Sequence, residues 1–303
     1  MKVQEIVSKL KDNQKRYLLY GGNTENILEA IKRSIENNFD IISEAYKIDN
    51  SNNELEKEKL LSQFEIEELK ESDTFKNKYG KVTNLYVPYG VLGVVSNCDA
   101  YNITRIMVLA IATRNGLVID ITNNVGITFM LVNEFNNVLN KMGLNNLLEI
   151  YNHKEGTNIE EVEEFDGMIY IGKKANAEKV KKSFNKPVIY SGCGNYELYI
   201  DNRLDDELVQ KANAMENIKI YSKKEIGIGQ EIRGLEEAIA RINENGNEYG
   251  VGIITESREN AKKFVNEIKA RNVFVNALPT IIDSKLDITE KDLVYQKSVL
   301  IYE

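Results

Sequence analysis

Apolar residues in the N-terminal part of the chain recur at every third or fourth position, which is the period of an amphipathic helix. Gly21-Gly22 supplies a turn, and Asn23 or Thr24 follows with a side-chain oxygen that can cap a helix. One apolar stripe then runs through Ile27, Leu28, Ile31, Ile35, Phe39 and Ile42. Residues 54–70 predict a second helix, and its dense charges indicate a solvated face. We therefore expect residues 1–75 to be largely helical.

From residue 82 onward the pattern changes to the short β-branched and aromatic runs that are typical of strands. Residues 82–95 (VTNLYVPYGVLGVV) carry Pro88 and Gly90 in the middle and predict two strands around a turn. Helices are then expected at 101–113, 127–142, 175–184, 204–214, 235–245 and 258–270, and strands at 117–122, 147–151, 168–171, 187–190, 197–201, 218–221, 251–255, 273–276 and 298–302. This alternation predicts an α/β fold with parallel sheets covered by helices, in two units that meet near Tyr190 to Asn195.

Charge and residue counts exclude several classes of protein. The 303 residues carry 39 Lys and Arg against 47 Asp and Glu, a net charge of -8, which disfavours a nucleic-acid partner. No run approaches the ~18 apolar residues of a membrane span, and the first residues lack the apolar run of a signal peptide. With 2 Cys and 1 His, neither a disulfide scaffold nor a Cys/His zinc site is expected. We expect a cytoplasmic protein without a metal.

Two glycine-rich segments invite a nucleotide-binding interpretation, and neither has the required pattern. Gly227-Ile228-Gly229 is followed by Gly234, which comes too late for the dinucleotide fingerprint. Gly192-Cys193-Gly194 follows a predicted strand, but the next segment, residues 196–201, predicts another strand. No helix N-terminus is therefore offered to a phosphate, and we interpret this segment as a turn between strands that lines a cleft.

The candidate nucleophiles are few. Cys98 and Cys193 are the two thiols; Asp99 would raise the pKa of Cys98, whereas Cys193 between glycines could be accessible. A free cysteine is more often a small buried apolar group than a nucleophile. His153 lies in a loop sequence, where a surface role is expected. The acidic cluster Asp201, Asp205 and Asp206 stands at a strand end, and helix capping explains it without a metal.

Several segments, in order and at matching spacing, resemble one known family. They are PYGVLGVV (88–95), YNIT (101–104), SGCGNYELYID (191–201), LEEAIARIN (235–243), IIT (253–255) and VFVNA (273–277). Together they are similar to the gamma-glutamyl phosphate reductases, also called glutamate-5-semialdehyde dehydrogenases, of the aldehyde dehydrogenase superfamily. The resemblance covers nearly the whole chain. It implies an aldehyde dehydrogenase-like fold with two parallel-sheet α/β domains and an oligomerisation arm.

On this resemblance we expect three parts. Residues 1–190 would form the helical N-terminus and a nucleotide-binding-like α/β domain, with an arm hairpin at 82–95. Residues 191–285 would form a truncated catalytic-like α/β domain, and residues 286–303 a C-terminal arm strand. An exposed arm pairs across subunits in the superfamily, so a homodimer is expected.

The sequence departs from the family where its chemistry resides. The family's thiolate lies in an Arg-Pro-x-x-Cys-Asn segment, but here residues 208–214 run almost directly into 215–221, and a large block is absent. Cys193 matches an apolar residue of the family instead. The resemblance implies NADP, yet the family's Arg-Gly-Gly-Lys-Glu is replaced by residues 121–125 (ITNNV), and weak or absent binding is expected. Asn102 corresponds to the side-chain amide that faces the developing oxyanion.

These matches and departures leave two alternative functions. The first is a pseudoenzyme that acts as a scaffold, a partner subunit or a binder of a small-molecule ligand, because the fold-bearing segments persist without the nucleophile. The second is an active NADP-dependent reductase of gamma-glutamyl phosphate, which uses Cys193 or Cys98 as a relocated thiol together with Asn102. In either case we expect no nucleic acid and no membrane as partner.

Overall fold

The computed structural model describes residues 2–50, 53–66, 72–77, 80–96, 99–121, 124–152, 158–172, 174–191, 196–202, 206–214, 218–245, 250–270, 272–279, 286 and 288–301. The chain divides into two compact units. Unit 1 comprises Met1–Ile171, Lys179–Ser191 and Lys285–Glu303, and unit 2 comprises Gly172–Glu178 and Gly192–Ser284. Within the described ranges, no helix has both the length and the apolar character that crossing a membrane requires.

The N-terminal segment is helical, as its period predicts. It forms α1 (Val3–Tyr20), α2 (Thr24–Asn37), α3 (Phe39–Asp49) and α4 (Lys57–Ser62). The predicted cap of α2 is confirmed, because the Asn23 side chain accepts hydrogen bonds from the backbone N–H groups of Glu25 and Asn26. The apolar stripe is divided between α2 and α3 at Asn38. The helix predicted over residues 54–70 is wrong in extent, since α4 spans six residues.

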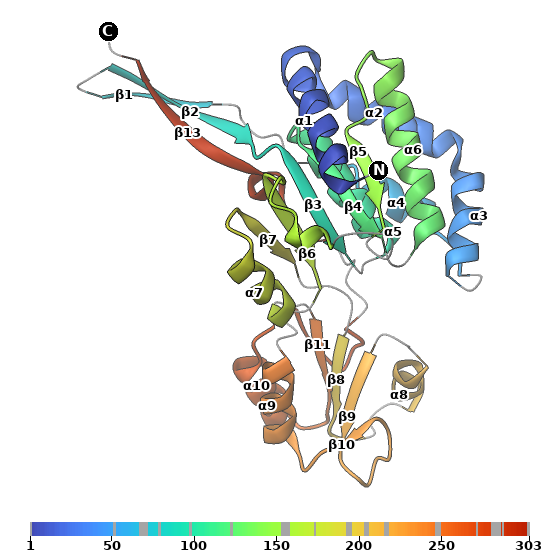
Figure 1. The fold of residues 1–303 in the computed structure, drawn as a ribbon. Coiled ribbons are helices and arrows are strands. Elements are labelled where there is room, and N and C mark those ends of the chain that lie inside the picture. Colours follow the sequence, from blue (N-terminus) through green and yellow to red (C-terminus); the bar gives the residue numbers. More distant parts are fainter. Residues whose placement is uncertain are drawn as a thin grey trace. The chain divides into compact units, whose positions relative to one another are not determined.

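A five-stranded parallel sheet forms the core of unit 1 (Figure 1). Its order is β5-β4-β3-β6-β7. The strands are β3 (Val91–Ser96), β4 (Gly116–Ile121), β5 (Leu148–Tyr151), β6 (Gly167–Ile171) and β7 (Val188–Ser191), and the helices between them are α5 (Ala100–Ala112), α6 (Val125–Lys141) and α7 (Lys174–Ser183). Helix α1 packs against β3 and β4, while α6 packs against β5 and carries α2 and α3 on its other side. The strand order reverses between β3 and β6, so this is a doubly wound sheet.

A second sheet in unit 1 forms an arm. It consists of β1 (Ser72–Asn77), β2 (Gly80–Pro88) and β13 (Val294–Ile301), in the antiparallel order β1-β2-β13. Figure 1 shows β13 beside β2, away from the five-stranded sheet. The arm hairpin predicted at residues 82–95 is wrong, because β2 pairs with β1 and β13 whereas β3 pairs with β4 and β6. The turn at Gly90 therefore redirects the chain from one sheet to another instead of reversing it.

Gly90 has a backbone that a side chain would strain. Its φ is +130°, and a Cβ at this position would overlap a carboxylate oxygen of Asp166. The Asp166 carboxylate accepts a hydrogen bond from the Val91 backbone N–H and forms an ion pair with Lys11. The Gly90 N–H donates a hydrogen bond to the side chain of Asn115. These contacts fix the direction in which β3 enters its sheet.

Unit 2 contains a second parallel sheet, in the order β10-β9-β8-β11-β12. Its strands are β8 (Tyr196–Ile200), β9 (Ile218–Ser222), β10 (Gln230–Glu231), β11 (Gly250–Ile254) and β12 (Asn272–Val275), and its helices are α8 (Asp206–Asn213), α9 (Leu235–Asn245) and α10 (Arg258–Glu267). Alternate residues of β8 serve two cores: Tyr199 packs with α9 and α10, and Leu198 packs with α8. Both faces of this sheet are therefore covered by helices, as the sequence predicts.

Candidate functional site

The carboxyl edge of the unit 1 sheet is a candidate ligand-binding site, because doubly wound sheets bind ligands beside the point where strand order reverses. Strand β3 ends there at Ser96, and α5 begins at Ala100. Strand β4 ends at Ile121, and α6 begins at Val125. The two helices therefore point their N-termini at this edge.

Helix α5 carries the predicted Asn102 in its first turn. Asp99 is the N-cap, and its carboxylate accepts a hydrogen bond of 2.9 Å from the Asn102 backbone N–H. The Asn102 residue is 4% exposed, and no hydrogen-bond partner for its Oδ1 atom is found within the described residues. An unpaired buried amide oxygen costs on the order of 1–3 kcal/mol, so this side chain is held at an energetic cost. It is the polar group of this edge that most clearly invites a ligand.

Aromatic side chains surround the start of α5. The Tyr101 hydroxyl accepts a hydrogen bond from the backbone N–H of Glu56, and the Lys59 ammonium lies 4.7 Å from the centre of the Tyr101 ring. Burial raises the pKa of Tyr101 to about 12 and, with the nearby Asp99 charge, also raises that of Tyr46. Burial raises the pKa of Asp99 as well, against the opposing effects of the Asn102 hydrogen bond and the Lys59 charge. This region therefore combines buried aromatic rings with the nearby carboxylates of Asp99 and Glu56.

The N-terminus of α6 is closed by a carboxylate from another helix. The Asp49 Oδ2 atom, at the end of α3, accepts a hydrogen bond of 2.8 Å from the Ile127 backbone N–H. A Cβ on Gly126 would lie 3.2 Å from the same oxygen, so the glycine allows the close approach. The position that the helix dipole offers to an anion is therefore taken by the chain itself.

The carboxyl edge of the unit 2 sheet is organised around Asp201, which directly follows β8. Its Oδ1 accepts from the Tyr199 hydroxyl (3.0 Å) and the Lys223 ammonium (2.8 Å), and its Oδ2 accepts from Thr255 Oγ1 (2.8 Å) and Asn260 Nδ2 (2.7 Å). Burial acts to raise the pKa of Asp201, but the four hydrogen bonds outweigh it and lower the pKa to about 2. Burial, together with the Asp201 charge, raises the pKa of Tyr199.

Further hydrogen bonds extend this cluster along the edge. Asn276 follows β12 with a φ of 54°, and its Oδ1 accepts from the Thr255 backbone N–H at 2.9 Å. The helix-capping explanation for Asp201 is wrong, because this carboxylate joins β8, β9, β11 and α10 instead. Asp205 lies outside the described residues. The four hydrogen bonds occupy all the lone-pair directions of the Asp201 carboxylate. The role of the cluster is therefore structural: it links the ends of these strands to α10.

The predicted nucleophiles are not placed by the structure. Cys98, Cys193 and His153 all lie outside the described residues, so the roles considered for them, including a catalytic role of Cys193 together with Asn102 in the alternative function, stay predictions. Helix α8 ends at Asn213 and β9 begins at Ile218, and the four residues between them, AMEN, include no cysteine. In the part of the chain that the structure describes, no group of three or more His, Cys, Asp or Glu side chains is arranged to hold a metal ion.

Comparison with known proteins defines the fold. No protein-family model matches the chain. Glyceraldehyde-3-phosphate dehydrogenase from Methanocaldococcus jannaschii, solved with NADP, is similar in structure, with 14% identity, a TM-score of 0.73 and coverage of 99% of this chain and 95% of that one. The two doubly wound parallel sheets and the antiparallel arm of this chain thus form the aldehyde dehydrogenase fold. The predicted fold class is confirmed.

The particular resemblance predicted from the sequence is also confirmed. The chain is similar to gamma-glutamyl phosphate reductase from Clostridium beijerinckii, with 24% identity over a match that covers 65% of this chain. It spans about 63% of the length of that relative. The structure of gamma-glutamyl phosphate reductase from Thermotoga maritima matches with a TM-score of 0.61 at 15% identity, over 100% of this chain and 99% of that one.

Proposed function

We propose that this aldehyde dehydrogenase-like protein lacks the thiol-dependent redox activity of its relatives and acts as a scaffold or a binder of a small ligand. The observation that carries the proposal is the short connection between α8 and β9. By resemblance, the family's cysteine segment belongs there, and four residues without a cysteine occupy it here. Loss of a covalent nucleophile lowers the rate by orders of magnitude, and an oxyanion donor such as Asn102 has no intermediate to stabilise without it.

The described residues do not fit the phosphates of NADP, the cofactor found in the Methanocaldococcus jannaschii relative. The N-terminus of α5 is capped by Asp99 and that of α6 by Asp49, so a phosphate at either helix would meet a carboxylate. The segment between β4 and α6 offers no Lys or Arg, since residues 121–125 read ITNNV. We therefore infer weak or absent binding of NADP.

A turnover assay tests the proposal directly. Purified protein would be mixed with glutamate-5-semialdehyde, phosphate and NADP, and NADPH formation would be followed by absorbance, with the Clostridium beijerinckii relative as a positive control. We expect no turnover above the protein-free background. Turnover that disappears in the Cys98→Ser, Cys193→Ser double variant would contradict the proposal and establish the alternative, an active reductase with a relocated thiol. In a parallel fluorescence titration, saturable micromolar binding of NADPH would contradict the inference on the cofactor.

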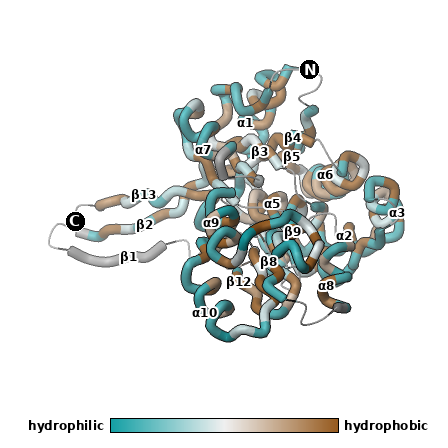
Figure 2. Tube along the Cα trace, turned by 90° about the horizontal axis from the view of Figure 1, so that it is seen from below, coloured by the Kyte–Doolittle hydropathy of each residue, from teal (hydrophilic) through white to brown (hydrophobic). Residues whose placement is uncertain are grey.

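We further propose that the protein is a homodimer that pairs through the arm. Among the described residues, each outer strand of the three-stranded sheet, β1 or β13, pairs with β2 alone and leaves its other edge for a partner. Hydrophobic segments alternate with hydrophilic ones along β2 and β13 (Figure 2), and Leu300 of β13 is 47% exposed. Light scattering after size exclusion should give twice the monomer mass for wild type and for Lys297→Glu, and a lower mass for Leu300→Glu. A monomeric wild type would refute the dimer.

A further inference from the structure

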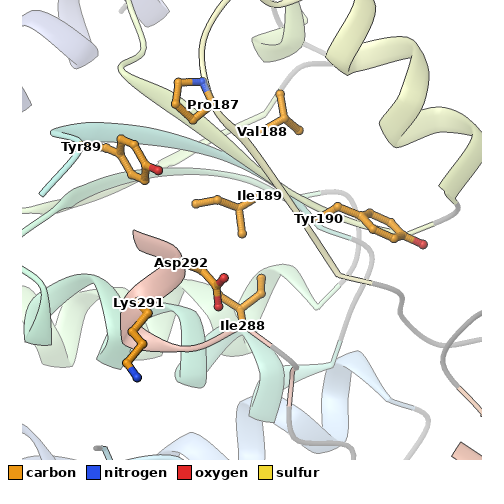
Figure 3. Close-up of a pocket in the computed structure, with 8 residues that line it drawn as sticks. All are labelled: Tyr89, Pro187, Val188, Ile189, Tyr190, Ile288, Lys291 and Asp292. Atoms are coloured by element: carbon orange, nitrogen blue, oxygen red, sulfur yellow. The ribbon is translucent and has the colours of Figure 1, made fainter. Parts of the chain in front are cut away.

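A pocket of about 430 Å³ opens in unit 1 between the edge strand β7 and the short turn that precedes β13 (Figure 3). This volume lies in the range of about 300–1,000 Å³ that small-molecule sites occupy. Its lining includes apolar side chains, and Figure 3 shows Ile189 of β7 and Ile288 on opposite sides of the space. Polar groups of the lining include Tyr89, Lys291 and Asp292.

The pocket lies apart from the edge of the sheet where this fold binds nucleotides. Tyr89 and Pro187, which line it, stand before the first residues of β3 and β7. Asn102 and the N-termini of α5 and α6 instead follow the last residues of β3 and β4. A ligand here would therefore be bound independently of any redox site.

Asp292 is held in one orientation. Its Oδ2 atom accepts two hydrogen bonds of 2.8 Å, from the backbone N–H and the hydroxyl of Thr289, and no partner for its Oδ1 atom is found among the described residues. The turn itself is anchored at both ends, because Glu290 pairs with the largely buried Arg105 and the Leu293 carbonyl accepts from Asn115 Nδ2 at 2.9 Å. A preorganised acceptor loses little entropy when a ligand binds.

Two other polar groups complete the lining. Figure 3 shows the Tyr89 hydroxyl directed toward the space over Ile189, and the Tyr89 ring is supported by Tyr295 at 5.9 Å. Lys291 points away from Ile189 in the same view, but its four-carbon stem can turn. In the described part of the chain the Lys291 ammonium has no ion-pair partner and the Tyr89 hydroxyl has no hydrogen-bond partner. The lining thus offers one positive charge, one negative charge and the Tyr89 phenol beside the apolar side chains of Ile189 and Ile288, while the Tyr190 hydroxyl points away.

We propose that this pocket binds an α-amino acid with an apolar side chain. The ligand's ammonium would bind the free Oδ1 of Asp292, its carboxylate would bind Lys291 and the Tyr89 hydroxyl, and its side chain would lie on Ile189 and Ile288. A zwitterion matches both charges of the lining, whereas an anion or a cation alone leaves one of them uncompensated.

Isothermal titration with leucine tests the proposal, with leucinamide and 4-methylpentanoate as analogues that lack the carboxylate and the ammonium. We expect saturable binding of leucine in the millimolar range or tighter, and at least tenfold weaker binding of each analogue. Asp292→Asn should weaken leucine binding at least tenfold, because it removes the negative charge that would bind the ligand's ammonium. The asparagine retains an oxygen that accepts the hydrogen bonds from Thr289.

Matched variants separate the pocket from the rest of unit 1. Tyr89→Phe and Lys291→Ala should each weaken leucine binding severalfold, and Lys297→Ala, on the neighbouring strand β13, should leave it unchanged. Far-UV circular dichroism would check that every variant is folded. The proposal is overturned if wild type shows no saturable heat up to the solubility of leucine. It is equally overturned if 4-methylpentanoate binds as tightly as leucine, or if Asp292→Asn binds leucine as wild type does.

Discussion

Substitution of Asp201 by asparagine should strongly destabilise unit 2. The pKa of Asp201 falls from 3.8 to about 2 in the folded protein, and each pH unit corresponds to about 1.36 kcal/mol, so the ionised form contributes about 2–3 kcal/mol. The introduced side-chain amide would also turn a donor NH₂ group toward groups that themselves donate. We expect urea denaturation followed by circular dichroism to show a loss of about 3 kcal/mol at pH 7. Glu207→Gln, which removes an exposed pair with Lys211, should change stability by less than about 0.5 kcal/mol.

The pH dependence of the same comparison has a definite sign. Because the folded pKa of Asp201 lies below its unfolded value, its stabilisation is fully present above about pH 4 and is lost as the pH falls toward 2. The difference between wild type and Asp201→Asn should therefore be constant from pH 7 to 5 and shrink below pH 4. A difference in unfolding free energy below about 0.5 kcal/mol at pH 7, or one that does not shrink in acid, would refute the conclusion that ionised Asp201 stabilises unit 2.

Three further predictions concern packing and buried polar contacts. Gly90→Ala should cost more than about 2 kcal/mol, since its Cβ would overlap the Asp166 carboxylate, while Gly234→Ala, with no atom within 4 Å, should be nearly neutral in the same denaturation assay. Asn115→Ala should cost about 2–4 kcal/mol because it removes three buried hydrogen bonds, with the Gly90 N–H, the Thr113 hydroxyl and the Leu293 carbonyl; a melting temperature equal to that of wild type would contradict this. Lys223→Met should cost less than Asp201→Asn, because the Lys223 side chain is 37% exposed and supplies one of four donors.

Most of the fold follows from local patterns in the sequence. Every strand of the two parallel sheets except the two-residue β10 lies where β-branched runs predict one, because buried parallel strands are apolar on both faces. The pattern fails at residues 82–95. Two strands separated by a turn resemble a hairpin locally, but the partner of each strand is decided by distant segments, namely β13 for β2 and β6 for β3. Strand pairing of this kind is not encoded in the period of a single segment.

The candidate sites were less predictable for the same reason. Asn102 could be singled out because residues 101–104 resemble a family segment, whereas the roles of Asp49 and Asp201 depend on partners far along the chain. Asp49 bonds to Ile127, 78 positions away, and Asp201 bonds to Asn260, 59 positions away. For an Asp at the end of a helix or a strand, the sequence suggests helix capping. Only the tertiary structure shows whether its carboxylate instead bonds to residues far along the chain.

The pairing of β13 with β2 has a consequence for biosynthesis. Ser298 bonds to Asn84 across 214 positions, and all the residues that build unit 2 after Gly192 are translated before β13. While the ribosome is still making β13, β1 is the partner of β2 among the described strands, and the other backbone edge of β2 is open. Nascent chains stalled before residue 294 should therefore expose this edge to chaperones and to proteases, and release of the C-terminal strand should close it.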